Sequence, residues 1–152
     1  MNYLDIDAFF PFYNEEKNTH ACVLYHDGTQ KYVKPNVAKY ILQLYFEAML
    51  NYEAIHNWSC DVLHAKCNLP LLFNKQCIFI PIKFRQPPYM PSPSYTYGYV
   101  HFNAIAFFSE HEVILKNQIV LQTISPTSFI EKKIRDAIFL GYVYEKKLGL
   151  PH

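Results

Sequence analysis

Residues 95–141 carry the clearest structural pattern in this 152-residue chain and read YTYGYVHFNAIAFFSEHEVILKNQIVLQTISPTSFIEKKIRDAIFLG. Aromatic, β-branched and other apolar residues dominate 98–108, which is typical of a strand packed on at least one face. Two shorter apolar runs follow at 112–116 and 119–123, and we expect them to form a hairpin. Asn117 lies between them, and asparagine tolerates the left-handed backbone that a tight turn needs.

A helix is predicted after this hairpin, over about 126–140. Ser125 stands at the position of an N-cap, Pro126 at the first helical position and Gly141 just beyond the last turn. Apolar residues recur between these signals at helical spacing and predict a core-facing stripe of Phe129, Ile130, Ile134, Ala137 and Ile138. The charged residues that fall outside the stripe, and are therefore expected to face water, are Lys132, Lys133 and Asp136.

The chain before residue 95 contains two further hairpin signals. Asp27-Gly28 is a strong signal for a tight turn, and Asn74-Lys75 separates two short apolar runs. The strand pairs that these turns predict are 21–26 with 30–33, and 69–73 with 77–82.

Apolar residues also predict a helix over about 36–52, which we expect to be well buried or to lie at a subunit contact. Residues 1–20 are expected to form an N-terminal arm and 142–152 a flexible tail. The chain is 51% hydrophobic and 18% charged, so it has enough apolar residues for one folded domain. We therefore predict a single α+β domain over 1–152, mainly an antiparallel sheet with two principal helices.

Charge and cysteine content narrow the classes of function. The formal net charge is only +1, although residues 59–109 hold three Lys and one Arg against one Asp. Any anion-binding surface should therefore come from the middle of the chain. The four Cys are not preceded by a secretory signal pattern, which favours a cytoplasmic protein with reduced thiols. Gln43 and Glu47 interrupt the longest apolar run, so no membrane span is expected.

Several short motifs follow one another in a recognisable order. They are Lys34-Pro35, Leu69-Pro70-Leu71-Leu72, Gly98-Tyr99 with His101, the strand that ends at Asn117, Ile124-Ser125 with Ser128-Phe129, and Arg135. In this order they resemble the competence transcription factor ComK family over roughly residues 22–141. The strand, hairpin and helix of the C-terminal half are also similar, more weakly, to LytTR-type DNA-binding domains.

The ComK resemblance implies a transcriptional activator of competence and DNA-uptake genes. Such a protein would bind A·T-rich double-stranded DNA as a homo-oligomer, without a cofactor or enzymatic activity. The sequence departs from the family pattern at 36–55, because the family has a basic stretch where this chain is apolar and nearly free of positive charge.

Five basic residues are the candidates for contacts with DNA. Lys83 and Arg85 stand at the root of a proline-rich loop at 86–94, and a stiff loop costs little entropy to place beside a groove. Lys132, Lys133 and Arg135 share the predicted C-terminal helix, where they could contact phosphates. The plainer alternative is a structural loop and an ordinary polar helix face.

Two other classes of function stay open on the residues alone. The near-zero net charge and the apolar 36–52 helix are typical of a protein-interaction module without DNA affinity. The possible zinc ligands are Cys60, His64 and Cys67. Their spacing matches no common zinc pattern, so we expect buried free thiols rather than a zinc site. No known catalytic motif is present, and we do not expect an enzyme.

Overall fold

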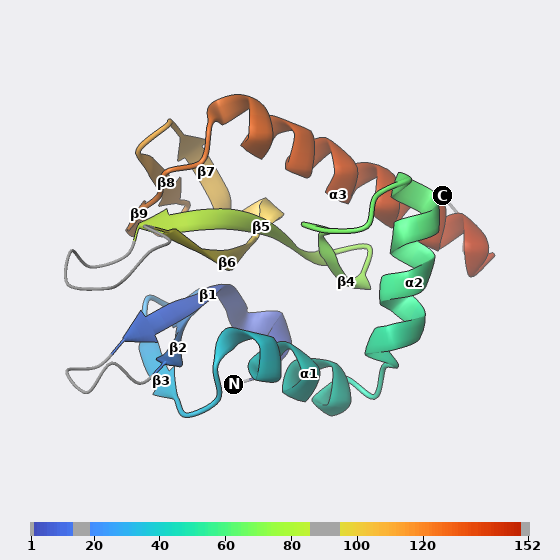
Figure 1. Cartoon of the computed structure of the whole chain (residues 1–152), viewed down its shortest axis with the longest axis horizontal. Coiled ribbons are helices and arrows are strands. Elements are labelled where there is room, and N and C mark those ends of the chain that lie inside the picture. Colours follow the sequence, from blue (N-terminus) through green and yellow to red (C-terminus); the bar gives the residue numbers. More distant parts are fainter. Residues whose placement is uncertain (1, 14–18, 86–94, 150–152) are drawn as a thin grey trace.

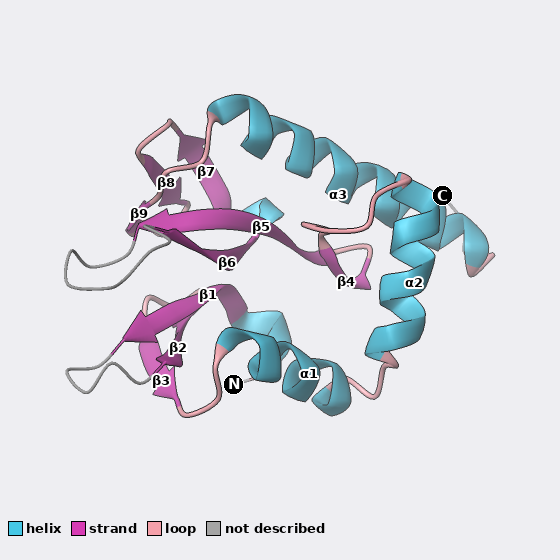
Figure 2. Ribbon diagram, in the orientation of Figure 1, coloured by secondary structure: helices cyan, strands magenta, loops and turns pink. Residues whose placement is uncertain are grey.

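The computed structural model describes residues 2–13, 19–85 and 95–149, which form an α+β fold (Figures 1 and 2). Its α+β class confirms the prediction from the sequence. A six-stranded antiparallel sheet has the order β3-β2-β1-β6-β5-β4, and a three-stranded one has the order β7-β8-β9. The elements are, in chain order, η1 (Tyr3–Asp5), β1 (Ile6–Tyr13), β2 (Thr19–Tyr25), β3 (Gln30–Val33), α1 (Val37–Glu47), α2 (Tyr52–Leu63), β4 (Leu71–Asn74), β5 (Cys77–Arg85), β6 (Tyr95–His101), η2 (Phe102–Ala104), β7 (Ile105–Phe108), β8 (Glu112–Leu115), β9 (Val120–Gln122) and α3 (Thr127–Lys147).

Helices cover both faces of the larger sheet, with α3 on one side and α1 on the other (Figure 1). Strand β5 is therefore apolar on both faces. Ile80 and Ile82 belong to the cluster that contains Ile130 of α3, whereas Phe79 belongs to the cluster that contains Leu44 of α1. All five side chains are fully buried, and burial of each contributes about 2 kcal/mol to folding.

The predicted N-terminal arm is wrong, because β1 is an interior strand. It pairs with β2 along its length and with β6 at Ala8 and Phe9. The Phe9 ring is fully buried and packs against the rings of Tyr40, Phe79 and Tyr99. This pairing joins segments about 90 residues apart, so no local signal in the sequence reports it.

The single strand predicted over 98–108 is divided between the two sheets. The chain leaves the larger sheet after His101, turns through η2 and enters the smaller sheet as β7. The His101 ring stabilises the turn, because its Nδ1 accepts a hydrogen bond from the backbone N–H of Asn103 at 3.2 Å. Within β6, Gly98 is required by space, since a Cβ atom there would lie 2.6 Å from the Cβ of Phe10.

The predicted helix over 36–52 ends early, and a helix that was not predicted follows it. Helix α1 stops at Glu47, and Met49 adopts a left-handed backbone with φ of 60°. Asn51 then caps α2 by accepting a hydrogen bond from the N–H of Ala54 at 2.9 Å. Asn51 is the sequence signal that would have indicated the second helix.

Helix α3 is longer than predicted and starts differently. It runs through Gly141, which packs against Ile78, and the predicted flexible tail is wrong for residues 142–147. The continuation is held by an ion pair between Lys75 Nζ and Glu145 Oε2 at 2.6 Å. Pro126 occupies the N-cap position without a side-chain cap, so the predicted capping role of Ser125 is also wrong.

The apolar stripe predicted for α3 is partly wrong. Ile130 and Ala137 are buried as expected, but Ile138 is exposed and Lys133 is buried. The buried face of α3 is therefore centred on Ile130, Lys133 and Ala137, and Leu140 extends it beyond the predicted stripe.

The hairpins at 21–33, 69–82 and 112–123 are confirmed in the strands that they join. In the last of them Gln118, with φ of 74°, adopts the left-handed backbone that was expected at Asn117. The Asn117 side chain instead accepts a hydrogen bond from the N–H of Ile119 at 3.2 Å. It also approaches the carbonyl of His26, so this turn contacts the β2–β3 turn.

Candidate functional site

Lys83 and Arg85 lie at the end of β5, and the proline-rich loop predicted at 86–94 lies outside the described residues. The backbone of Lys83 forms hydrogen bonds to the segment that leads into α3. Its N–H donates to Ser125 Oγ at 2.9 Å, and its carbonyl accepts from the N–H of Ile124 at 3.0 Å. Ser125 is therefore a buried link between β5 and the start of α3.

A row of cations and rings joins the two groups of basic residues that the sequence singled out. Lys83 Nζ lies 5.9 Å from the centre of the Tyr97 ring, and Lys133 Nζ lies 5.3 Å from the centre of the Phe129 ring. The two ring centres are 6.5 Å apart. Both ammonium groups are within the distance at which a cation is attracted to a ring face. We call Lys83, Tyr97, Phe129 and Lys133 the cation–aromatic row.

Lys133 differs from the other four candidates because its side chain is only 7% exposed. Burial lowers the pKa of its ammonium group, Lys132 lowers it further, and Asp136 partly opposes both effects. A group so enclosed offers little surface to a phosphate, and it supports Phe129 instead. The expectation that Lys133 faces water is therefore wrong.

Lys132 and Arg135 are exposed on α3. Lys132 Nζ forms a hydrogen-bonded ion pair with Asp136 Oδ2 at 3.2 Å, one helical turn away. An exposed pair of this kind is worth little to stability. The Lys132 ammonium group can therefore exchange this partner for another anion at small cost.

Arg85 also lines a cavity of about 340 Å³ together with Glu110, His111, Ile124 and Pro126. The cavity brings the end of β5 next to the β7–β8 turn and the start of α3. Arg85 presents positive charge there, while Glu110 opposes a bound anion.

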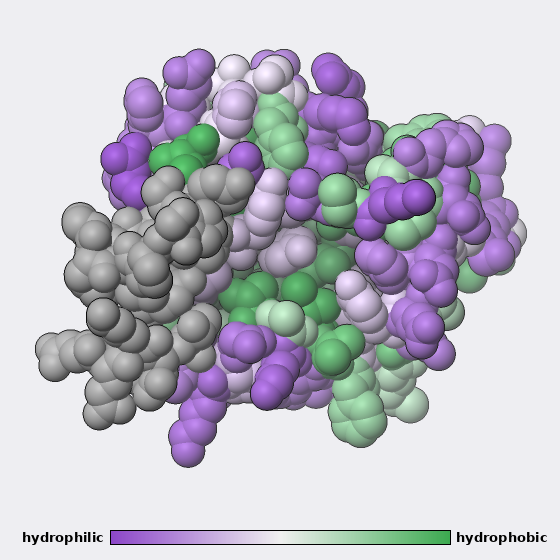
Figure 3. Space-filling model, in the orientation of Figure 1, coloured by the Kyte–Doolittle hydropathy of each residue, from purple (hydrophilic) through white to green (hydrophobic). Residues whose placement is uncertain are grey.

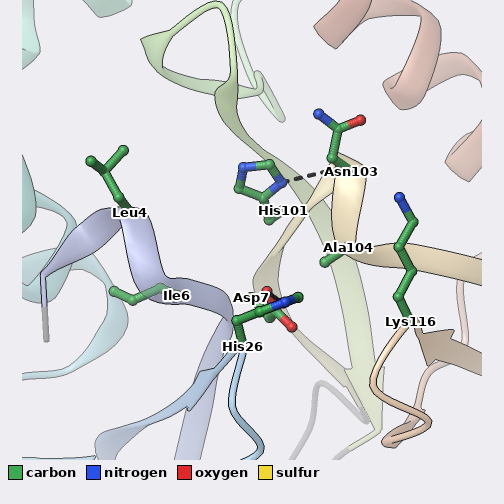
Figure 4. A pocket seen from close by; sticks show the side chains of 8 residues that line it. All are labelled: Leu4, Ile6, Asp7, His26, His101, Asn103, Ala104 and Lys116. Atoms are coloured by element: carbon green, nitrogen blue, oxygen red, sulfur yellow. Dashed lines mark hydrogen bonds and ion pairs between the residues drawn. The ribbon is translucent and has the colours of Figure 1, made fainter.

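A second cavity, of about 250 Å³, is lined by residues that lie far apart in the sequence. Figure 4 shows Leu4 and Ile6 on one side of it and Lys116 on the other, with Asp7 and two histidines between them. The histidines are His26 of the β2–β3 turn and His101 at the end of β6. Only the pairing of β1 with strands on both sides brings these groups together.

Asp7 is the buried acid of this cavity. Burial raises the pKa of its carboxyl group, and the neighbouring His26 and His101 partly oppose that shift. Its oxygens make two long contacts of 3.5 Å, to His26 Nδ1 and to Asn117 Nδ2. The two contacts are too long to be strong hydrogen bonds to the carboxylate. A carboxyl group with a pKa shifted in this way is common at functional sites and is also found in structural networks.

His101 has both ring nitrogens engaged by backbone groups. Its Nε2 lies 2.9 Å from the carbonyl oxygen of Gln76, which can only accept, so Nε2 carries the proton. Its Nδ1 accepts from the N–H of Asn103. Burial lowers the pKa of the ring, which agrees with a neutral imidazole in a structural role.

The possible zinc ligands do not gather into a site. Cys60 Sγ approaches His56 Nε2 at 3.7 Å, His64 ends α2 in a left-handed conformation, and Cys67 is exposed beyond it. In the ranges that the structure describes, no three His, Cys, Asp or Glu residues are placed to hold a metal ion. Cys22 and Cys77 are buried, and burial raises the pKa of their thiols to about 11 and about 12.

None of the helices in the described part of the chain combines the length and the apolar character needed to cross a membrane. Comparison of the chain with protein-family models, with curated proteins and with solved structures found no match.

Proposed function

We propose that the protein is a ComK-like transcriptional regulator that acts in the cytoplasm. In this proposal it activates competence and DNA-uptake genes by binding A·T-rich double-stranded DNA as a homo-oligomer. The order of short motifs along residues 22–141 motivates the family, and the arrangement of basic side chains supports an interaction with DNA.

The observation that carries the proposal is the cation–aromatic row. Basic residues from β5 and α3, far apart in sequence, lie around one pair of rings, and Arg85 lies two residues beyond Lys83 on the same strand. Lys133 is enclosed, so the phosphate contacts in this proposal come from the exposed or half-exposed Lys and Arg residues of the same two elements, because phosphate groups are recognised by such side chains on a protein surface. The local charge explains how a chain of net charge +1 can still bind a polyanion.

Four exposed or half-exposed cations lie on β5 and α3, namely Lys83, Arg85, Lys132 and Arg135. Each phosphate contact releases counterions and adds about −0.9 to the slope of log affinity against log salt. Four contacts therefore predict a slope of about −3.6, or a loss of roughly a hundredfold in affinity for a fourfold rise in salt. Preference for A·T-rich DNA would come from groove shape rather than from these contacts.

Fluorescence anisotropy with an A·T-rich duplex and a G·C-rich duplex of equal length tests the proposal across a salt series. We expect tighter binding to the A·T-rich duplex, with a steep salt slope. Lys83→Glu/Arg85→Glu should abolish the binding. Lys31→Glu/Lys34→Glu makes the same change in net charge near the opposite edge of the sheet and should retain selective binding.

The absence of binding to either duplex at low salt would refute the proposal. Equal losses in the two charge-reversal variants would also refute it, because they would show that only the net charge matters.

A further inference from the structure

Helix α1 is apolar on both sides. Tyr40, Ile41, Leu44 and Tyr45 face the core, as in any surface helix that packs on a sheet. On the outward side Leu42 is 54% exposed, Phe46 83% and Met49, just past the helix, 92%. These three follow the spacing i, i+4, i+7 and form one strip, which we call the α1 strip. Figure 3 shows hydrophobic side chains gathered at this side of the molecule, over the outer end of α1.

The backbone at Met49 gives a second, independent indication. The N–H of Leu50 bonds to the carbonyl of Tyr45 at 2.9 Å, and the N–H of Met49 bonds to the carbonyl of Phe46 at 3.0 Å. These two bonds define the helix ending in which the left-handed residue is usually Gly. Met pays a steric cost in that conformation, yet its side chain is almost wholly in water. The Met49 side chain therefore packs little against the described residues, and a contact outside the protomer would offset the steric cost.

We propose that the α1 strip is the surface on which two copies of this chain associate, with their α1 helices packed antiparallel about a two-fold axis. The proposal deepens the oligomeric part of the proposed function by naming its interface. A two-fold interface places the same patch of both copies face to face, so the patch must complement itself.

The charges beside the strip meet that requirement. Lys39, Gln43 and Glu47 succeed one another at intervals of four along one flank of the α1 strip, and the Gln43 amide donates to the Glu47 carboxylate at 3.1 Å. Antiparallel two-fold packing brings the same flank of both helices together. Lys39 of one copy then lies opposite Glu47 of the other, twice, with Gln43 near the axis. Parallel two-fold packing would put this flank of the two helices on opposite sides of the interface, so the Lys39–Glu47 pairs could not form.

The strip is short, so the association is expected to be of moderate strength. An 11-residue helix is about 16 Å long and covers less area than a standard interface of about 800 Å² per partner. We expect a dissociation constant on the order of micromolar, with Phe46 as the largest contributor because it is a large and highly exposed ring.

Sedimentation velocity of the full chain without DNA, up to several hundred micromolar, tests the interface. Phe46→Glu should make the protein monomeric throughout. Phe107→Glu, at a ring of β7 that is 57% exposed, should leave the dimer unchanged. A monomeric wild type, or a dimer that survives Phe46→Glu, would overturn the proposal.

Exchanging the charges of Lys39 and Glu47 tests whether the partner at the α1 strip is a second copy of this chain. Lys39→Glu and Glu47→Lys should each weaken the dimer about tenfold, because each places like charges opposite one another. The double exchange restores both pairs and should restore the wild-type dissociation constant. Failure of this rescue would overturn the antiparallel arrangement.

Met49→Gly should change the stability of the protomer and the affinity of the dimer in opposite directions. It should raise the melting temperature measured at dilute, monomeric concentration and at the same time weaken the dimer several-fold. A dimer unaffected by Met49→Gly would remove Met49 from the interface. Since these measurements contain no DNA, they can fail or succeed independently of the anisotropy experiment.

Discussion

Gly98→Ala should destabilise the protein more than the addition of a single methyl group would suggest. A Cβ atom at residue 98 would lie 2.6 Å from Phe10 Cβ and 2.6 Å from Phe84 Cε2, against an ordinary contact distance of at least 3.4 Å. The new methyl group must therefore displace its neighbours by 3.4 − 2.6 = 0.8 Å. Phe10 Cβ is attached to the backbone of β1, and the Phe84 ring is stacked on the Phe10 ring at 4.8 Å. Overpacking against atoms that cannot move aside costs up to about 3 kcal/mol, and we expect a loss near that limit.

Urea denaturation of the wild type and the variant, followed by circular dichroism, measures this loss. Phe84→Leu removes the ring that opposes the new methyl group and supplies the control. The double variant Gly98→Ala/Phe84→Leu should lose clearly less stability than the sum of the two single changes, because the pair shares one space. A loss of less than about 1 kcal/mol for Gly98→Ala, or strict additivity in the double variant, would refute the packing argument.

Three further changes test other contacts. Asp7→Asn should stabilise the protein at neutral pH. Folding raises the pKa of the Asp7 carboxyl, so this group favours the folded state while it is protonated and loses that contribution as pH rises through the raised pKa. The neutral amide of Asn avoids the cost of a buried charge at neutral pH. The gain should vanish in acid below the ordinary pKa, and melting temperatures that fall at neutral pH would contradict it. Ser125→Ala should cost about 2 kcal/mol in urea denaturation, because it leaves the N–H of Lys83 without its acceptor, and a loss below about 0.5 kcal/mol would contradict that role. Tyr45→Phe should cost about 1 kcal/mol in the same assay by removing the buried hydrogen bond to the Leu72 carbonyl at 2.8 Å, whereas an unchanged midpoint would show that this bond contributes nothing.

The α1 strip and the cation–aromatic row lie on different elements of the fold. The strip belongs to α1, which packs beside β1 and β2, whereas the row belongs to β5, β6 and α3. A dimer formed through α1 would therefore leave Lys83 and Arg85 of each copy outside the interface. In the proposed regulator, two such surfaces in one dimer would bind DNA more tightly than either alone, provided that both reach the same duplex.

Local chemistry explains the parts of the fold that sequence analysis predicted correctly. Asp27-Gly28 forms a turn because the Asp27 side chain accepts a hydrogen bond from the N–H of Thr29 at 2.9 Å, and glycine adopts φ of 91° without strain. Runs of alternating or continuous apolar residues likewise predicted β2, β5 and β8. In each case the residues that determine the element are neighbours in the chain.

The candidate DNA-contacting residues were only partly predictable, because the exposure of a side chain depends on tertiary packing. Lys83 and Arg85 could be singled out because they are basic residues before a proline-rich segment, and the structure places both near the start of α3. Lys133 was misplaced because helical spacing alone put it outside the apolar stripe. The Lys133 side chain is in fact only 7% exposed, and its Nζ lies 5.3 Å from the centre of the Phe129 ring.

Residue types, turn motifs and periodicity were thus sufficient for the α+β class, three hairpins and the regions of two helices, because these depend on contacts between neighbouring residues. Long-range pairing placed β1 between β2 and β6, brought Asp7 next to His26 and His101, and left Leu42, Phe46 and Met49 on the outside. Which face of α1 meets the sheet depends on the packing of the whole core. An apolar pattern along the helix cannot by itself distinguish a buried apolar face from an exposed one.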